Sequence, residues 1–410
     1  MGDAIRMMYL IGQYPAINHG YLLAEIRHLR RLGFDVVVTS VKMPDRPPER
    51  LSSEERAEAA ITYYLRSVSW YWMIGAVGSE ILRAPLRCLQ GLTYSLRLTG
   101  CSMSRIMYHL AYFVEAVLVG REMRRLGIRH VHASFSVTVA LITTRIFPVT
   151  MSFGVYGYGE LHDPGKSRLT DRISAALFVR SISRNARGQL MLSCDQSQWS
   201  KLYYVPLGVD PAEFPPRPQP SKGGALRLLC VGRLAPEKGQ IFLLHAMAEL
   251  KAPARALHLH LVGDGPDRLR LEREAARLGV AANITFEGAV DADRLAELYA
   301  NSDVFVLPSL AEGIPIAAME AMAKEIPCVA PRIAGLPELI GDGVDGMLFH
   351  VADIEDLVRV IRILIDSAEL RTEIGQRARL RVERDYNMER NTENFAHVLR
   401  QKLAETAIEQ

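Results

Sequence analysis

A stretch rich in proline divides this chain of 410 residues into two halves that show the same pattern. Six prolines lie between 206 and 220, and Ser221-Lys222-Gly223-Gly224 follows them. Prolines and glycines at this density mark a boundary between folded segments. On both sides, short apolar runs alternate with segments of helical periodicity, which is typical of parallel sheets covered by helices. The chain is therefore predicted to form two α/β domains in tandem.

The predicted elements of both halves follow the order expected of a doubly wound sheet. In the first half, strands are predicted over 7–11, 34–39, 130–134 and 149–155, and helices over 21–32 and from a capping box at 52–55. In the second half, strands are predicted over 226–231, 258–262, 284–286, 304–307 and 328–330, and helices over 240–250, 268–278, 294–300 and 317–323. The remaining tail, 354–410, is mostly helical in pattern.

Composition and charge exclude several classes of protein. Apolar residues make up 49% and charged residues 23%, so a disordered or coiled-coil chain is excluded. The net charge is +3, but residues 1–220 hold 26 Lys and Arg against 17 Asp and Glu, while the remainder holds 23 against 29. The first half is therefore basic, which favours an anionic partner or surface, unless it only reflects an arginine-rich composition. No nucleic-acid partner is expected.

The segment from 60 to 110 is rich in aromatic residues and arginines. Its apolar run 68–78 is too short to span a membrane, which takes about 20 residues. Helices of this composition can lie in a membrane interface, or they can pack beside a sheet. Both readings stay open at this point.

The cysteines and the N-terminus favour a cytoplasmic protein. The five cysteines are scattered without a C-x-x-C pair, so neither a disulfide framework nor a zinc cluster is expected. The apolar stretch near the start is eight residues long and lacks a small-residue cleavage site, so a signal peptide is not expected. We therefore expect a cytoplasmic location, with peripheral contact at the inner membrane face as an option.

One candidate binding loop follows the predicted strand 226–231. Gly232 and Arg233 stand directly after it, and Lys238 lies five residues later at the start of a helix. An arginine offers a planar fork for phosphate oxygens, and a lysine offers a point charge. A helix N-terminus adds backbone N–H groups and a partial positive charge. This combination suits a diphosphate, although a surface loop with two cations gives the same pattern.

A second candidate loop runs from 308 into the helix 317–323. Glu312 lies in the loop, and Glu320 follows eight residues later in an apolar helix. Between them, the backbone of Gly313-Ile314-Pro315-Ile316 lies near a helix N-terminus, where N–H groups lack partners within the helix. A glutamate in apolar surroundings is costly unless it is hydrogen-bonded, and sugar or ribose hydroxyls would donate such bonds. A capped, solvated helix is the alternative.

Together these loops resemble the C-terminal domain of family 4 glycosyltransferases. The order and spacing of the loops carry the resemblance, with support from 261–266, 298–309 and 335–338. It implies the GT-B fold: two facing Rossmann-like doubly wound domains and a C-terminal helix that crosses back. Domains are then expected at 1–207 and 222–387, with a linker at 208–221 and a helix at 388–410 on the first domain.

The resemblance also implies an enzyme, a hexosyltransferase that moves a sugar from a nucleotide-diphospho-sugar to an acceptor with retention at the anomeric carbon. Arg233 and Lys238, beside Gly232, would hold the diphosphate without a metal or another cofactor. Glu320 would hold the ribose. Glu312 and the backbone of 313–316 would contact the donor sugar.

The first half is similar to one branch of that family, the enzymes of colanic acid and similar exopolysaccharide assembly. The matching stretches are 14–15, 25–26, 130–133, 152–153, 182–183 and 204–210. By this similarity, His132 would face the donor sugar from the first domain. The acceptor loop departs from the usual pattern of the branch at Asn18, His19 and Gly20, which are the candidate acceptor-binding residues. A glycan or a lipid-linked saccharide is the expected acceptor.

Three other functions compete with this one. The altered acceptor loop and the basic first half also fit a catalytically silent partner subunit of a membrane polysaccharide machine. A nucleotide-sugar epimerase is disfavoured by the paired glutamates. A dehydrogenase is disfavoured because Gly341 to Gly346, which spells GxGxxG, lacks the strand and helix on its two sides and is read as a turn.

Two further patterns are read as structural. Asp291-Ala292-Asp293 spells a metal-binding DxD, but it stands where a helix needs a cap. His258 and His260 alternate along a predicted strand and are expected to pack there rather than to bind a metal.

Overall fold

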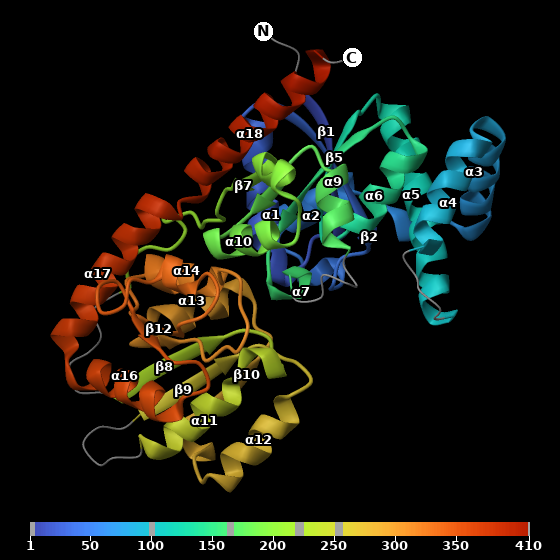
Figure 1. Ribbon diagram of the computed structural model, residues 1–410. Helices are drawn as coiled ribbons and strands as arrows, with labels where there is room; N and C mark the ends of the chain where they lie inside the picture. Colours follow the sequence, from blue (N-terminus) through green and yellow to red (C-terminus); the bar gives the residue numbers. More distant parts are fainter. Residues whose placement is uncertain (1–4, 98–102, 162–167, 218–224, 251–256, 409–410) are drawn as a thin grey trace. The chain divides into compact units, whose positions relative to one another are not determined.

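The computed structural model describes residues 5–97, 103–161, 168–217, 225–250 and 257–408 (Figure 1). They form two compact units. The first unit comprises Met1–Ile182, Ala186–Val205 and Glu389–Gln410, and the second comprises Ser183–Asn185 and Pro206–Met388. Each unit is a parallel sheet with helices on it, which confirms the predicted α/β class.

The sheet of the first unit has seven strands in the order β3-β2-β1-β4-β5-β6-β7. The chain runs outward from β1 through β2 to β3, and then crosses over to β4 and continues to β7. The strand order therefore reverses between β1 and β4. The strands are β1 (Ile5–Gln13), β2 (Phe34–Lys42), β3 (Tyr63–Tyr64), β4 (His130–Ser134), β5 (Thr150–Val155), β6 (Val179–Ser181) and β7 (Leu202–Tyr204).

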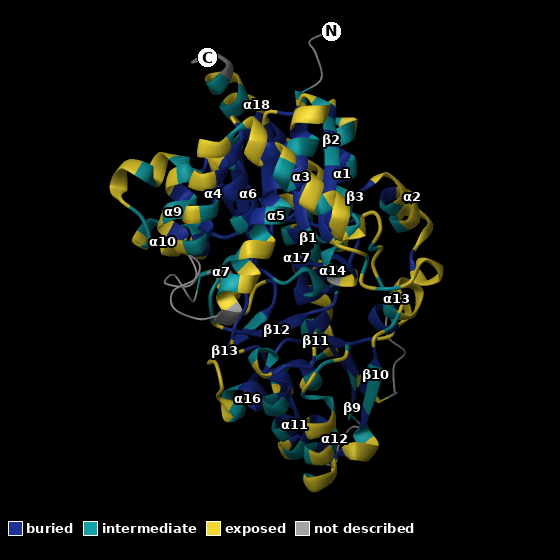
Figure 2. Ribbon diagram, turned by 90° about the vertical axis from the view of Figure 1, so that its right-hand side faces the viewer, coloured by how far each residue is buried: buried dark blue, intermediate teal, exposed yellow. Residues whose placement is uncertain are grey.

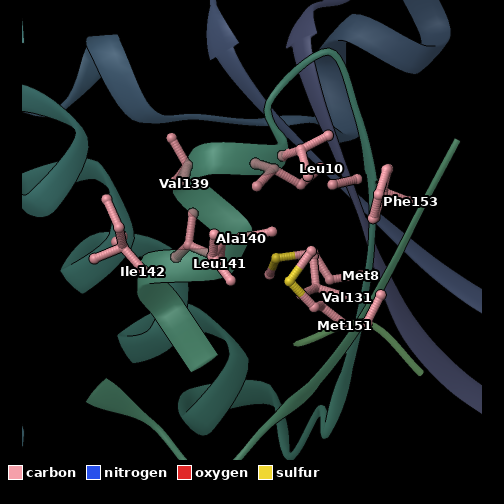
Figure 3. Close-up of a cluster of buried hydrophobic side chains, with 14 of the residues drawn as sticks. Met8, Leu10, Val131, Val139, Ala140, Leu141, Ile142, Met151 and Phe153 are labelled. Atoms are coloured by element: carbon pink, nitrogen blue, oxygen red, sulfur yellow. The ribbon is translucent and has the colours of Figure 1, made fainter. Parts of the chain in front are cut away.

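Helix α6 covers the centre of this sheet and forms the core with it. Met8 of β1 pairs with Val131 of β4, and both side chains are fully buried. Figure 3 shows these residues, with Leu10, on the side of the strands that faces Ala140 of α6, whereas Ile142 points away from them. Strands that are buried in this way need apolar residues at successive positions, which is why residues 7–11 of β1 form an uninterrupted apolar run.

The segment 60–110 contributes to the helices α3 to α5. For this segment the sequence left open whether the helices lie in a membrane interface or pack beside the sheet. Helix α3 packs on α4 and α5, and α4 and α5 in turn pack on α6. Among the described residues, no helix is both long and apolar enough to cross a membrane. The helices are α1 (Gly20–Arg31), α2 (Ser53–Ile61), α3 (Trp70–Arg83), α4 (Pro85–Arg97), α5 (Met103–Leu126), α6 (Val137–Ile146), α7 (Tyr158–Leu161), α9 (Leu169–Ala175), α10 (Arg184–Leu192) and α18 (Met388–Ile408).

The last helix, α18, packs on the first unit, as the sequence predicted. Arg400 donates a hydrogen bond to the backbone oxygen of Leu32 at 2.6 Å. The guanidinium of Arg180, on β6, lies 4.4 Å from the centre of the Phe395 ring. Phe395 is fully buried, so the helix completes the interior of this unit.

The sheet of the second unit has six strands in the order β10-β9-β8-β11-β12-β13. In Figure 2 the strands β11 and β12 are dark blue, which marks buried residues, whereas the edge strand β10 is largely teal. The elements are β8 (Leu226–Val231), α11 (Gln240–Glu249), β9 (Leu257–Val262), α12 (Arg268–Arg277), β10 (Ile284–Gly288), α13 (Ala292–Ala300), β11 (Val304–Val306), α14 (Ile316–Ala323), β12 (Cys328–Pro331), α15 (Leu336–Leu339), β13 (Met347–Phe349), α16 (Ile354–Asp366) and α17 (Ala368–Asp385).

The proline-rich stretch, expected as a linker over 208–221, belongs to the second unit as far as it is described. Val209 forms a β-bridge with Asn387. A Cβ added to Gly208 would lie 2.3 Å from the backbone oxygen of Tyr386. Arg217 donates to the backbone oxygen of Ser302 at 2.5 Å. The stretch 208–217 is thus held against the second unit at both of its ends, and 218–221 lie outside the described residues.

Candidate active site

Both predicted binding loops lie where the strand order of the second sheet reverses. The chain runs from β8 through β9 to β10, and then returns to β11 on the other side of β8. One loop follows β8, and the other follows β11. Since β8 and β11 are parallel neighbours, both loops open at the same edge of the sheet. Open α/β sheets bind their ligands at such a point.

Backbone contacts hold the two loops together. The backbone N–H groups of Leu310 and Ala311 donate to the backbone oxygen of Glu237 at 2.9 and 3.2 Å. Gly239 has a φ of +63°, and a Cβ there would lie 2.2 Å from the backbone oxygen of Pro308. Only glycine meets both demands, the left-handed backbone and the close approach. The loops therefore form one preformed surface.

Lys238 and Glu312 meet on this surface. The Nζ of Lys238 lies 2.6 Å from Oε1 of Glu312, and the hydroxyl of Ser309 donates to the same oxygen at 2.7 Å. The lysine side chain is 25% exposed and the glutamate side chain 6%. The ammonium group therefore remains accessible at the edge of the sheet, above a carboxylate that it partly covers.

Arg233 is the more exposed cation of the pair. Its side chain is 58% exposed, and its Nη2 donates to Oε1 of Glu237 at 2.6 Å. This hydrogen bond lowers the pKa of Glu237. The side-chain amide of Gln240 donates to the backbone oxygen of Arg233 at 2.9 Å, and the N–H of Gly232 donates to Val262. The backbone is thus fixed while the guanidinium extends into solvent.

Helix α14 begins beside these loops, and its N-terminus has no side-chain cap. Pro315 occupies the position before the helix, where no side-chain oxygen accepts from the first turn. The loop in front of it packs tightly, since a Cβ at Gly335 would lie 2.6 Å from the Ile314 side chain and 2.8 Å from the oxygen of Gly313. The first amides of α14, which starts at Ile316, are therefore donors that a ligand can use.

Glu320 is held by Tyr299. The tyrosine hydroxyl donates to Oε2 of Glu320 at 2.8 Å and approaches the backbone oxygen of Ala317 at 3.1 Å. Burial raises the pKa of Glu320, and this hydrogen bond opposes the shift. The sequence predicts that this glutamate needs hydrogen-bond donors in its apolar helix. The structure shows that Tyr299 is such a donor, which the sequence analysis did not identify.

An aromatic cluster lies at the corresponding edge of the first sheet. His19, in the short turn before α1, stacks on Phe135 after β4, with ring centres 4.6 Å apart. Tyr156, after β5, lies 5.1 Å from the same phenylalanine. The predicted acceptor residues are in this region, with Gly20 exposed at the start of α1 and Asn18 in the turn before it.

Phe135 is a residue that the sequence analysis missed. Its φ is +64°, a left-handed backbone that a bulky side chain rarely adopts, and 41% of its surface is exposed. Such strained residues concentrate at functional sites. The sequence carries no signal for it, because nothing in the residue type marks the unusual backbone.

His132 does not lie on a surface of the first unit. It has no exposed area, its Nδ1 lies 2.8 Å from the Ser152 hydroxyl, and its ring contacts Phe178 and Phe395. Burial holds its pKa well below the usual value. The expectation that His132 faces a bound sugar is therefore corrected: in this structure it is a core residue.

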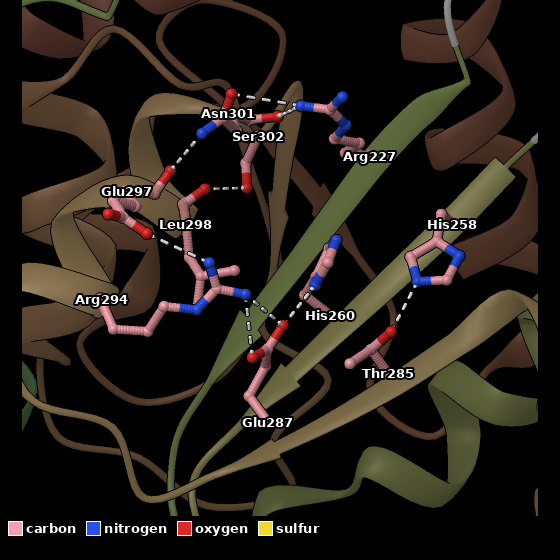
Figure 4. A network of polar contacts seen from close by, with 10 residues as sticks. All are labelled: Arg227, His258, His260, Thr285, Glu287, Arg294, Glu297, Leu298, Asn301 and Ser302. Atoms are coloured by element: carbon pink, nitrogen blue, oxygen red, sulfur yellow. Dashed lines mark hydrogen bonds and ion pairs between the residues drawn. The ribbon is translucent and has the colours of Figure 1, made fainter.

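The histidines and the DxD sequence of the second unit have structural partners, as predicted. His258 lies 2.8 Å from the Thr285 hydroxyl, and His260 lies 2.8 Å from Oε1 of Glu287, which also accepts from Arg294 (Figure 4). Asp291 caps α13 by accepting from the backbone N–H of Arg294. Within the described ranges, no group of three or more acidic, histidine or cysteine side chains is arranged to hold a metal.

The GxGxxG stretch is a turn, as predicted. A β-bridge joins Asp342 to Gly346, and the strand β13 follows directly. No helix begins at its last glycine, so the geometry of a dinucleotide site is missing.

Two Rossmann-like units with loops at the switch point define a protein of the GT-B fold class. A solved structure of HepE from Anabaena in complex with UDP-glucose matches with a TM-score of 0.73 and 16% identity, over 97% of this chain and all of that one. At this identity the match shows the fold, and it confirms the predicted GT-B architecture.

Residues 213–381, which make up most of the second unit, match the model of the family described as glycosyl transferases group 1. The predicted resemblance to family 4 is thereby confirmed. A GDP-mannose-dependent alpha-(1-6)-phosphatidylinositol monomannoside mannosyltransferase of Mycolicibacterium smegmatis is 31% identical over 202 residues, 46% of this chain and 52% of that protein. The colanic acid biosynthesis glycosyltransferase WcaL of Escherichia coli is 31% identical over 201 residues, 47% of this chain and 49% of that one. The chain thus spans about half the length of these relatives.

Proposed function

We propose that the chain is a retaining glycosyltransferase of the hexosyltransferase class, which transfers a sugar from a nucleotide-diphospho-sugar to a glycan or lipid-linked saccharide acceptor. The relatives support this proposal, because all those described above are named for sugar transfer or bind a nucleotide sugar. The colanic acid relative supports a role in exopolysaccharide assembly. The donors in these names differ, GDP-mannose in one and UDP-glucose in another, so the base and the sugar stay open.

One observation carries the proposal: two cations stand beside an uncapped helix at the switch point of the second sheet. Arg233 and Lys238 each hold a carboxylate, at 2.6 Å in both cases. A diphosphate has a higher charge than a carboxylate and would compete for both cations. Arg233 is well suited for this, since more than half of its side chain is exposed.

The chemistry of transfer explains why such cations would accelerate the reaction. When the bond between the sugar and the diphosphate breaks, negative charge develops on the leaving phosphate and positive charge on the sugar. Preorganised cations and helix N–H groups stabilise the leaving group, and they need no reorganisation at that moment. In our proposal Arg233, Lys238 and the first turn of α14 do this in place of a metal. Glu312 then faces the sugar, and Glu320 accepts from the ribose hydroxyls.

The acceptor is proposed to bind the first unit at the edge that carries His19 and Phe135. Burial lowers the pKa of His19, so its ring is neutral at physiological pH. Stacked neutral rings offer an apolar face of the kind on which sugar rings pack. His132 is left out of the proposal, because it has no surface that a sugar could touch.

Donor binding tests the proposal. A panel of UDP, GDP, ADP and their sugars should contain one nucleotide series that raises the melting temperature of the wild type. A ligand at 100 times its dissociation constant stabilises by about 2.7 kcal/mol, which is readily measured. Arg233→Ala and Lys238→Ala should each weaken that nucleotide about 10- to 100-fold, because a hydrogen bond to a charged group contributes about 1.5–3 kcal/mol.

Arg270→Ala is the matched control, because Arg270 is an exposed arginine of the same unit on α12. It should leave nucleotide binding unchanged. Failure of every nucleotide to bind, or equal weakening by Arg270→Ala, would refute the proposed donor site. Release of the nucleoside diphosphate from the matching donor in the presence of a saccharide acceptor then tests transfer itself.

A further inference from the structure

Helices α3 and α4 expose a concentrated apolar face. Of the 22 large apolar side chains that are exposed in the described parts of the chain, eight fall between 70 and 89. Leu82 is 87% exposed and Leu86 75%. Figure 2 shows both helices with exposed residues along their outer sides. We call this set the α3–α4 face; it comprises Trp70, Tyr71, Trp72, Ile74, Ile81, Leu82, Leu86 and Leu89.

This face is presented by a well-packed pair of helices. On the opposite side, Glu80 is buried and receives two hydrogen bonds from Arg124 of α5, at 2.8 and 2.6 Å. Gly91 of α4 lies so close to α6 that a Cβ there would come within 2.4 Å of the Ile146 side chain. The inner sides of both helices are therefore fixed to the body of the first unit. The outer sides of both helices remain exposed to solvent.

The exposed charged side chains on α3 and α4 are all positive. Between 59 and 114 the sequence contains five arginines and one acid, Glu80, and that acid is buried in its pair with Arg124. The five arginines are exposed: Arg66, Arg83, Arg87, Arg97 and Arg105. Arg83 and Arg87 lie within the stretch that forms the face itself.

We propose that the α3–α4 face docks into the interface of an anionic lipid bilayer. Tryptophan and tyrosine favour the level of the lipid headgroups, and leucine and isoleucine favour the acyl chains just below them. Arginines at the rim of such a face pair with anionic headgroups. A bilayer fits this mixture better than a protein does, because the face offers no exposed acid for a partner's cations. The helices would lie on the membrane without crossing it.

The proposal is independent of the sugar-transfer chemistry, since it rests on another surface and needs no donor. If the proposed function also holds, docking would bring a lipid-linked acceptor to the enzyme. Failure of vesicle binding would leave the nucleotide-binding result untouched, and the reverse is also true. The two proposals can therefore fail separately.

Tryptophan fluorescence tests the proposal directly. The chain has three tryptophans, and two of them, Trp70 and Trp72, lie on the face. The Trp199→Phe variant of the full chain leaves only these two as reporters. Its emission should shift to the blue on vesicles with 30% phosphatidylglycerol, and lipids brominated in the acyl chain should quench it. Vesicles of phosphatidylcholine alone should bind much more weakly.

Paired variants separate the apolar and the electrostatic contributions. Arg83→Gln/Arg87→Gln should weaken binding about 25-fold, about fivefold for each arginine near the surface, and added salt should act in the same direction. Leu82→Asp/Leu86→Asp should weaken it more than tenfold without affecting folding, because both side chains are exposed. The controls are Arg270→Gln/Arg273→Gln and Leu269→Asp on α12, which should bind as the wild type does.

Three results would overturn the proposal. The first is no binding to anionic vesicles, and the second is binding that Leu82→Asp/Leu86→Asp leaves unchanged. The third is a combination of two observations. Light scattering shows a concentration-dependent dimer of the wild type that this double variant abolishes, and the wild type does not bind vesicles. That result would assign the face to a second copy of the chain. Blue shift, quenching and loss in both double variants would together support the bilayer.

Discussion

The buried ion pair between Glu25 and Arg180 should control the stability of the first unit. Nη1 of Arg180 donates to Oε2 of Glu25 at 2.5 Å, and Tyr9 donates to the other carboxylate oxygen at 2.8 Å. The two side chains are 4% and 1% exposed. The arginine also donates to the backbone oxygen of Val205 and lies against Phe395. One charged network thus joins β1, α1, β6 and the last helix.

The magnitude follows from what each single substitution leaves behind. Glu25→Gln keeps the shape and leaves an uncompensated arginine in the interior. Breaking one side of a buried pair costs about 3–5 kcal/mol. For a unit of this size that lowers the melting temperature by roughly 6–20 °C. Arg180→Met should cost a similar amount, and the double variant should cost about 1–3 kcal/mol less than the sum, because it removes both charges.

The assay is urea unfolding followed by tryptophan fluorescence. All three tryptophans, at 70, 72 and 199, lie in the first unit, so the signal reports on that unit alone. The control is Asp35→Asn, which breaks an exposed pair with Arg6 and should cost less than about 1 kcal/mol. If Glu25→Gln costs as little as this control, or if the two buried substitutions simply add, the reasoning is wrong.

Three further predictions concern single positions. Burial lowers the pKa of His130 to about 3, so the unfolded chain takes up a proton at a higher pH than the folded chain. This residue alone should contribute a loss of about 2 kcal/mol to the stability of the first unit between pH 7 and pH 5, in addition to the loss from His132, whose pKa is also lowered. His130→Asn should flatten that profile of urea midpoint against pH, and an unchanged slope would count against it. Gly239→Ala should cost about 2 kcal/mol or more in thermal unfolding, because its Cβ would meet Pro308, whereas Gly78→Ala on α3, with open space around it, should cost nothing. Ser52→Ala should cost about 1 kcal/mol, because Ser52 caps α2 within a complete capping box; a negligible shift of the urea midpoint would contradict this.

The sequence predicts the second unit almost residue by residue. The strand over 226–231 matches β8, and the predicted helix 268–278 ends one residue beyond α12. The strands β8, β11 and β12 are apolar at almost every position, and the helices between the strands follow the helical period, so both patterns can be recognised without any tertiary information. The positions of the two candidate loops were predictable for the same reason, since each loop directly follows a strand that the pattern identifies.

The features that the sequence did not predict share a physical cause, which is contact between segments that are distant in the sequence. His132 reads as an accessible strand-end residue, but Phe395 from the far end of the chain covers it. The left-handed backbone of Phe135 is imposed by its surroundings and has no sequence signature. The prolines after 206 indicate an irregular path, and such a path can pack on a domain as well as join two of them. In α3 the aromatic residues are exposed while Ala76 and Glu80 are buried, so the rule that large apolar side chains face the core predicts the wrong side of this helix.

Because α18 packs on the first unit, the two units cannot complete their folds in the order in which they are synthesised. The second unit is encoded between two pieces of the first, and its own stretch ends at residue 388. During synthesis its chain is therefore complete while the first unit still lacks Phe395 and Arg400. Until helix α18 has left the ribosome, His132 and Arg180 lack part of their cover. The first unit, although most of it is translated first, is therefore completed only after the second unit, and a truncation that removes α18 should destabilise the first unit.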